Sequence, residues 1–404
     1  MIDFRDPAFL DDPYPTLAEV REATPIFPVE DPKGRGATLW FLTRYDDVYR
    51  ALRDRRLGRI KGSTPTPEEL GIPSDRPDLA PYFEVEQWSL LMLEPPEHTR
   101  LRRLVAGAFT PKRIEGLRPA ITGHADRFLD EVVGAGPFDL LTQYAQPYSV
   151  HVIAELLGVP TDDWRSLLDW SHAIVKMYEL DRTEEQVRAA VQASREFTEW
   201  CRELIADRRA RPRDDLVTDL VTAETEDGRL TDDEIVSTII LLLNAGHEAT
   251  VNTLGNGVTA LMEHRDQWRA LVEGRVDART AVEELIRFDP PLQLFERWVR
   301  EEGVVYGGRE IPVGDKLAML FGSANRDPRH FPHPDRFDVA RGDSSHITFG
   351  GGIHYCLGAP LARLELDVAL SRLVARAPGL DLVEPPRRNP TFVIHGYEAV
   401  RVVA

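Results

Sequence analysis

A single cysteine near the carboxyl-terminal end of the chain stands in a setting that suits metal ligation. Cys356 follows three glycines at positions 350–352, and the stretch that begins at Leu357 is typical of a helix. Glycines allow a tight turn and the close approach of a bulky partner. The N–H groups and the dipole of a helix start favour a thiolate, so we expect a lowered pKa for the Cys356 thiol. A thiolate on a loop that can lie flat against a planar group is what cysteine ligation of haem iron requires; a structural cysteine in a glycine-rich turn is the alternative.

Six positions around this cysteine form the pattern Phe-Gly-x-Gly-x-His-x-Cys-x-Gly. They are Phe349, Gly350, Gly352, His354, Cys356 and Gly358. The pattern resembles the haem loop of the haem-thiolate monooxygenases, the cytochrome P-450 family. The resemblance implies that Cys356 ligates the iron of haem b. It also implies that the cofactor-binding site includes Phe349, Gly350, His354 and Gly358.

Other catalytic motifs are incomplete in this sequence. His247 and Glu248 begin the H-E-x-x-H pattern of zinc proteases, but the fifth position is Val251. No G-x-S-x-G nucleophile motif is present. No C-x-x-C-H attachment motif is present either, so we expect the haem to be bound non-covalently.

A basic helix face is expected shortly after the proline pair at positions 95–96. His98 and Arg102 are four residues apart and therefore share one side of that helix. Two cationic donors on one side suit a carboxylate partner, and a solvated basic face is the alternative. The resemblance assigns both residues to a haem propionate. It also matches Arg297 to the arginine that binds the second propionate.

A long helix is predicted to begin at Thr231. Thr231 and Glu234 form a capping box, and the helical pattern continues to about His264. At about 1.5 Å per residue, such a helix is nearly 50 Å long and can cross the whole molecule.

The middle of this helix carries the candidate catalytic residues. Ala245 and Gly246 make the helix thin, so a bulky group can press against it, and Glu248 among apolar neighbours is costly unless it has a role. The resemblance implies an oxygen-activating helix in which Glu248 is the acid and Ala245 and Thr250 belong to the catalytic site. Ala249 stands where many members of the family have a threonine. Either Thr250 acts through a water molecule, or the substrate supplies the missing polar group, or oxygen is coupled to product less tightly.

Two further segments carry candidate site residues. Glu284 and Arg287 are three residues apart on a predicted helix, which indicates a surface ion pair or, by the resemblance, a buried structural pair behind the haem. Residues 292–297 are predicted to be extended, which puts Gln293, Phe295 and Arg297 on one face.

The substrate pocket is predicted to be mostly apolar. Residues 61–81 contain five prolines and two glycines, which predicts a long irregular loop, and the resemblance places this loop over the pocket. A mostly apolar lining with a few polar groups suits a lipophilic or aromatic small molecule. The candidate pocket residues are Trp88, Leu90, Leu241, Asn244, Gln293, Phe295, Phe392 and Val393.

Composition excludes several classes of protein. The formal net charge of −18 argues against nucleic acid as a partner, because phosphate binding needs basic surfaces. With only two cysteines, Cys201 and Cys356, a reducing cytoplasm is the simpler inference. The start of the sequence has no apolar run for a signal peptide, and no stretch approaches the roughly 18 apolar residues of a membrane span. We expect a soluble, cytoplasmic monomer without a membrane anchor.

The resemblance covers nearly the whole chain, from residues 12–15 to Gly396. It implies the cytochrome P-450 fold, which is mainly α with smaller β-sheets and shaped like a triangular prism. The haem then lies between the long central helix and the helix that follows the cysteine loop. We expect residues 1–404 to form a single catalytic domain with no fused reductase domain.

The activity implied is monooxygenation with O2 as co-substrate. The product is a hydroxylated, epoxidised or O-dealkylated small molecule. Electrons would come from NAD(P)H indirectly, through a separate reductase and a ferredoxin-type donor. A basic docking face for an acidic donor is predicted from Arg102, Arg103, Lys112, Arg113 and Arg363. A peroxide-driven haem oxidase and a haem-based sensor or carrier without turnover are the alternatives.

Overall fold

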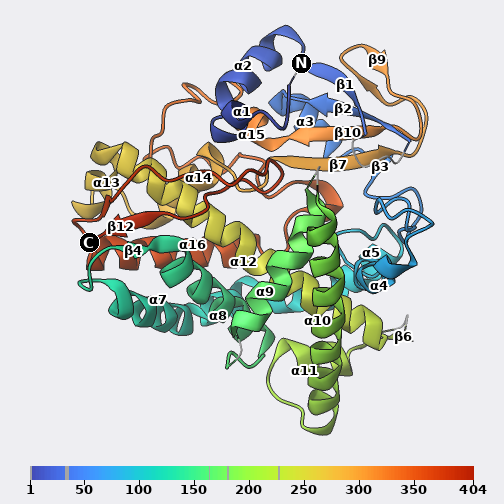
Figure 1. The fold of residues 1–404 in the computed structure, drawn as a ribbon, viewed down its shortest axis with the longest axis horizontal. Coiled ribbons are helices and arrows are strands. Elements are labelled where there is room, and N and C mark those ends of the chain that lie inside the picture. The colour runs from blue at the N-terminus through green and yellow to red at the C-terminus, as the bar shows by residue number, and fades with distance from the viewer. Residues whose placement is uncertain (1, 32–35, 163, 180–181, 226–227) are drawn as a thin grey trace.

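A computed structural model of the protein describes residues 2–31, 36–162, 164–179, 182–225 and 228–404. Most of these residues are helical, and the largest sheet lies on one side of the helical part (Figure 1). The prediction of a mainly α fold with smaller sheets is confirmed. Among the residues described, none of the helices combines the length and the apolar character that a membrane crossing needs.

The α-helices differ widely in length. They are α1 (Pro7–Asp11), α2 (Tyr14–Ala23), α3 (Tyr45–Ala51), α4 (Ala80–Glu86), α5 (Glu97–Ala106), α6 (Pro111–Gly116), α7 (Arg118–Val132), α8 (Gln146–Leu157), α9 (Trp164–Val175), α10 (Glu184–Ala210), α11 (Leu216–Thr222), α12 (Asp232–Glu263), α13 (Arg265–Val272), α14 (Ala278–Phe288), α15 (Phe321–Ala324) and α16 (Ala359–Arg376). Short 3-10 or π segments are η1 (Pro77–Leu79), η2 (Gly107–Phe109), η3 (Leu141–Ala145), η4 (Lys176–Tyr178) and η5 (Gly352–His354).

The strands form one larger sheet and three small ones. They are β1 (Ile26–Glu30), β2 (Thr38–Leu42), β3 (Leu57–Gly58), β4 (Phe138–Asp139), β5 (Glu224–Thr225), β6 (Gly228–Arg229), β7 (Leu294–Val299), β8 (Val305–Tyr306), β9 (Arg309–Glu310), β10 (Lys316–Leu320), β11 (Asp381–Leu382) and β12 (Arg401–Val403). The larger sheet has the order β1-β2-β10-β7-β3, and only its β2–β10 pair is parallel. A second sheet has the order β11-β12-β4.

The central helix α12 runs through the middle of the molecule (Figure 1). Its predicted capping box is confirmed, because the hydroxyl of Thr231 accepts from the N–H of Glu234 at 3.2 Å and the Glu234 carboxylate accepts from the N–H of Thr231 at 2.8 Å. The helix has 32 residues, which corresponds to about 48 Å. Most of its side chains are buried, so packing on several sides fixes its position.

Two glycines let neighbouring side chains press directly on α12. A Cβ atom on Gly246 would lie 2.6 Å from Cγ1 of Ile153 on α8, and one on Gly257 would lie 2.5 Å from a methyl carbon of Leu285 on α14. The interpretation of Gly246 as room for a bulky group is therefore wrong, because Ile153 of the chain itself uses that room.

A buried ion pair joins α14 to the irregular segment at residues 325–341. Arg287 donates from Nε and Nη2 to the carboxylate of Glu284 at 2.7 and 2.9 Å, and both side chains are fully shielded from solvent. The Arg287 guanidinium also donates to the carbonyl of Asn325 at 2.8 Å, while Glu284 accepts from Arg341 at 3.1 Å. Glu284 and Arg287 therefore act together as a clamp on this segment.

We expect Glu284→Gln to destabilise the protein strongly. The change leaves the Arg287 charge buried without its counter-ion, which costs about 3–5 kcal/mol of unfolding free energy. Urea unfolding followed by tryptophan fluorescence measures the loss. Glu22→Gln is the control, because Glu22 pairs with Arg329 on the surface, where an ion pair contributes little. Equal urea midpoints for the two variants would contradict the clamp.

Candidate functional site

The loop before Cys356 is held in a tight turn against Leu52, the residue that follows α3. Gly352 has a φ of +66°, and a Cβ atom there would lie 2.3 Å from the carbonyl oxygen of Leu52. No other residue fits that conformation and that contact. The N–H of Cys356 donates to the carbonyl of Phe349 at 2.9 Å and closes the loop. Gly350 also has a positive φ, +70°.

The sulfur of Cys356 lies just before α16. Burial raises the pKa of the Cys356 thiol, although the backbone N–H groups of Gly358 and Ala359 and the nearby cation Arg102 act in the opposite direction. The expectation of a lowered pKa is therefore wrong for the chain alone, because desolvation of a thiolate outweighs these contacts. A metal ion bonded to the sulfur supplies the charge that the protein lacks and deprotonates a coordinating thiol.

Three cationic or donor groups near the cysteine loop lack an acidic partner. Burial lowers the pKa of Arg297 well below its usual value, and the nearby charge of Arg59 adds to the effect. Within the described part of the chain, no carboxylate lies at ion-pair distance from Arg297 or Arg102. Among the described residues, the buried Nε2 of His98 has no hydrogen-bond partner. Arg297 and Arg102 donate only to backbone carbonyls, so we call Arg297, Arg102 and His98 the unpaired donors, meaning that they lack a carboxylate partner in the described part of the chain. Haem b carries two propionates, so this set fits that cofactor.

Glu94 organises the other side of this cluster. Its carboxylate accepts from the backbone N–H of Arg59 at 2.6 Å and lies 3.0 Å from Nε2 of His354. Burial lowers the pKa of His354 to about 3, and its ring lies 4.5 Å from that of His98. The structure thus places His354 beside the unpaired donors but commits its Nε2 to Glu94. Sequence analysis missed Glu94, and the only signal was an acid directly before a proline pair.

One side of α12, near the middle of the helix, carries small side chains that are exposed. Ala245 and Ala249 are exposed, Leu241 and Glu248 are partly buried, and the residues around the rest of the helix are buried. Residues three or four apart share a helix face, so these four form a continuous strip. We call Leu241, Ala245, Glu248 and Ala249 the α12 strip. Its alanines leave a low surface that suits a flat group.

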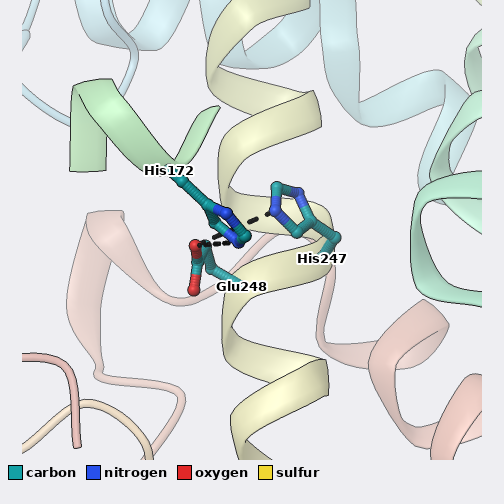
Figure 2. A group of neighbouring side chains, drawn as sticks. All are labelled: His172, His247 and Glu248. Atoms are coloured by element: carbon teal, nitrogen blue, oxygen red, sulfur yellow. Dashed lines mark ion pairs between the residues drawn. The ribbon is translucent and has the colours of Figure 1, made fainter. Parts of the chain in front are cut away.

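Glu248 is the one charged member of this strip, and Figure 2 shows the residues around its carboxylate. Oε1 lies 3.1 Å from Nε2 of His172 on α9, and Oε2 accepts from Nδ2 of Asn252 at 3.3 Å. Glu248 is thus held between two helices rather than among apolar residues only. Sequence analysis missed His172, because no local pattern connects a residue on α9 with one on α12.

Thr250 lies on another side of α12. It is buried, its hydroxyl donates to the carbonyl of Gly246 at 3.4 Å, and it lies beside Glu365 of α16. Burial raises the pKa of Glu365 to about 8. Helix geometry turns Thr250 about 100° away from Ala249, so its hydroxyl is not on the α12 strip. This agrees with the expectation that Thr250 does not replace the hydroxyl missing at Ala249, and its action through a water molecule stays a prediction.

Three predicted pocket residues point elsewhere. Gln293 precedes β7 rather than lying within it, and its buried amide donates to the hydroxyl of Tyr14 at 3.2 Å. The ring of Phe392 lies 5.2 Å from that of Phe9, and Val393 packs in the same amino-terminal cluster. The prediction that Gln293, Phe392 and Val393 line the pocket is wrong, because strand alternation does not extend to Gln293 and the first helix covers the other two.

The remaining pocket candidates lie in the main core or near the unpaired donors. The Phe295 ring lies between the guanidinium groups of Arg59 and Arg297, at 4.2 and 4.5 Å from its centroid. Asn244 is buried, and its Oδ1 has no hydrogen-bond partner. Trp88, Leu90 and Leu241 belong to or pack against the same hydrophobic core.

Comparison with known proteins places this geometry in a family. A family model described as Cytochrome P450 matches residues 135–274 and 278–379. The polyketide biosynthesis cytochrome P450 PksS of Bacillus subtilis (strain 168) is 38% identical over 381 residues, which are 94% of this chain and 91% of that protein. Nocardicin C N-oxygenase of Nocardia uniformis subsp. tsuyamanensis is 40% identical over 392 residues, 96% of this chain and 93% of that protein.

Solved structures agree with these relatives. The crystal structure of P450BioI in complex with an acyl carrier protein ligated to hexadec-9Z-enoic acid has a TM-score of 0.90 and 32% identity. The match covers 99% of this chain and all of the P450BioI chain. The structure of PksS has a TM-score of 0.88 and 35% identity, and covers 100% of this chain and 99% of that chain. The chain belongs to the cytochrome P450 family.

Proposed function

We propose that this cytochrome P450 monooxygenase oxidises a lipophilic small molecule, with haem b held by Cys356 and electrons drawn from a ferredoxin-type donor. The family uses haem and O2. The observation that carries the assignment of the residues is the set of unpaired donors beside the cysteine loop, Arg297, Arg102 and His98. Among the described residues, no carboxylate lies at ion-pair distance from the buried Arg297 or the partly buried Arg102.

The haem supplies oxygen activation and oxidising power when it is bound. Cys356 would hold the haem iron through its sulfur, toward which the N–H groups of Gly358 and Ala359 are directed. Arg297, Arg102 and His98 are proposed to hold the propionates. Phe349, whose ring lies under the Arg363 guanidinium at 4.5 Å, helps to fix the loop.

Proton delivery is proposed to run through Glu248. Its carboxylate lies on the α12 strip, and Asn252 holds one of its oxygens. Ala245 keeps the adjacent surface low. Ala249 offers no hydroxyl beside this carboxylate, so an ordered water or a polar group of the substrate has to complete the relay.

The substrate is proposed to meet apolar side chains above the α12 strip. Leu241 and Asn244 come from α12 itself, and Trp88 and Leu90 come from the segment that follows α4. Mostly apolar lining with a single amide suits hydroxylation, epoxidation or O-dealkylation of a lipophilic or aromatic molecule. A screen of compounds for a spin-state shift of the haem would identify the substrate class.

A ferredoxin-type donor is proposed to dock near the cysteine loop and to link the enzyme indirectly to NAD(P)H. Arg103 and Lys112 are exposed there. Arg113 pairs with Asp219 at 2.8 Å and Arg363 pairs with Glu283 at 2.6 Å, so part of the predicted basic face is neutralised. We therefore assign the docking charge on this face to Lys112, which is exposed.

We expect Cys356→Ser to abolish the thiolate signature of the reduced carbon monoxide complex, because serine supplies no sulfur ligand. Absorption spectra of the purified protein measure this directly. Cys201→Ala is the control, since Cys201 is fully buried in α10 and its loss leaves the iron ligand in place. A thiolate spectrum that persists in Cys356→Ser contradicts the assignment of Cys356 as the iron ligand.

We expect Ala249→Thr to raise the fraction of NAD(P)H electrons that reach product rather than hydrogen peroxide. The exposed position accepts the larger side chain and gains a hydroxyl next to Glu248. Ala249→Val has the same shape without the hydroxyl and is the matched control. Product and peroxide are quantified per NAD(P)H consumed, with a substrate found by the spin-state screen. The same ratio in both variants contradicts a hydroxyl effect.

A further inference from the structure

Three side chains bring their ligand atoms together between α9 and α12. His172 lies on α9, and His247 and Glu248 are neighbours on α12 (Figure 2). Nε2 of His172 is 3.1 Å from Oε1 of Glu248, and Nε2 of His247 is 3.9 Å from the same oxygen. The three ligand atoms all lie within 4.8 Å of one another. Two imidazole nitrogens and one carboxylate oxygen are a donor set that zinc accepts.

The ring of His247 is already oriented for metal binding. His247 is 2% exposed, and its Nδ1 lies 2.8 Å from the carbonyl of Leu243, so Nδ1 carries the proton and donates it there. Nε2 therefore presents a lone pair, and it has no hydrogen-bond partner. Its near neighbour is an acceptor too, the carboxylate of Glu248. The buried lone pair of Nε2 faces the Glu248 carboxylate, so a cation that binds between the two groups would satisfy both. A metal-bound histidine usually donates its other ring N–H to an acceptor such as a backbone carbonyl, as Nδ1 of His247 does here.

The other two groups complete the site and open it to solvent. Asn252 occupies Oε2 of Glu248, which leaves Oε1 for the histidines. The side chain of His172 is 37% exposed, so an ion can reach it, and water can fill the fourth coordination position. Nε2 of His172 lies 3.1 Å from Oε1 of Glu248 and can act as a ligand in the tautomer that carries the proton on Nδ1.

We propose that His172, His247 and Glu248 form a Zn²⁺ site that fastens α9 to α12. Bonds of about 2.0–2.2 Å in a tetrahedral site separate ligand atoms by about 3.3–3.6 Å, so the observed distances require only small side-chain movements. The sequence lacks the second histidine of an H-E-x-x-H motif, because Val251 stands at that position. In the fold, His172 of α9 supplies the missing imidazole.

Zinc at this site has a consequence for turnover. The ion binds the carboxylate that the proposed function uses for proton delivery, and it joins α9 to the α12 strip. Zn²⁺ therefore slows oxidation. This consequence rests on the proposed role of Glu248, whereas zinc binding itself does not.

The test is calorimetric titration of the haem-loaded full chain with ZnCl2, after dialysis against a chelator. We expect saturable binding of one Zn²⁺ per chain. His172→Gln should weaken the affinity at least about tenfold, because glutamine removes an imidazole ligand from an exposed position. His124→Gln is the matched control: His124 also lies beside a carboxylate, 3.7 Å from Glu155, but belongs to no three-ligand cluster in the described ranges. Its zinc affinity should equal that of the parent.

Two further measurements place the ion and its effect. Anomalous diffraction at the zinc edge from soaked crystals should give a peak among the three side chains. Added Zn²⁺ should slow oxidation in the parent and in His124→Gln, and much less in His172→Gln. Absence of saturable binding, an unchanged affinity in His172→Gln, or a peak elsewhere overturns the site. Binding at the site without inhibition overturns the consequence for turnover. The carbon monoxide spectrum tests the proposed function separately, so the two failures are distinguishable.

Discussion

Burial of positive charge without a matching acid is the constraint on which the haem site depends. Arg297 lies on β7, between β10 and the edge strand β3 of the larger sheet, and is buried where water stabilises its charge little. Desolvation of such a group is costly unless an anion accompanies it. The charge of Glu94 favours the charged form of Arg297, but the Glu94 carboxylate contacts His354 and the backbone N–H of Arg59 and forms no ion pair with Arg297 among the described residues. We propose that the haem propionates supply the missing ion-pair partner.

The sides of the central helix α12 differ in role: some pack against neighbouring helices, and one carries the α12 strip. Gly246 and Gly257 admit Ile153 and Leu285, so neighbouring helices lock α12 from two directions. In the α12 strip, Ala245 and Ala249 are exposed and keep the surface low, while Glu248 contacts His172 of α9. Because the rigid sides and the open side belong to one continuous helix, the position of Glu248 is determined by contacts made several residues away.

Features with a local cause were predictable from the sequence. The start of α12 follows from Thr231 and Glu234, whose side chains and backbones satisfy each other, and the turn before Cys356 follows from glycines that no other residue can replace. Features with a distant cause were not. His172 reaches Glu248 only because α9 crosses α12, and Phe392 turns toward Phe9 only because the first helix lies there.

The predictions for the pKa of Cys356 and for the position of Gln293 failed for the same reason. A helix start by itself lowers the pKa of a thiol. In the folded chain, removal of Cys356 from water raises its pKa by more than the helix start lowers it, and this desolvation depends on the whole fold. Gln293 likewise has the right spacing for a shared face with Phe295, yet the strand begins one residue later. Spacing alone specifies a face only where the regular element has already started.

The contact between Gly246 and Ile153 limits how such an enzyme can diversify. A methyl group added at position 246 has no free volume, and a shift of α12 to make room would disturb α8 and α14 together. New specificities in a lineage with this packing must then arise in segments that can change without moving the helix. The packing of α12 would stay almost unchanged between relatives, while the segments that do not contact it change.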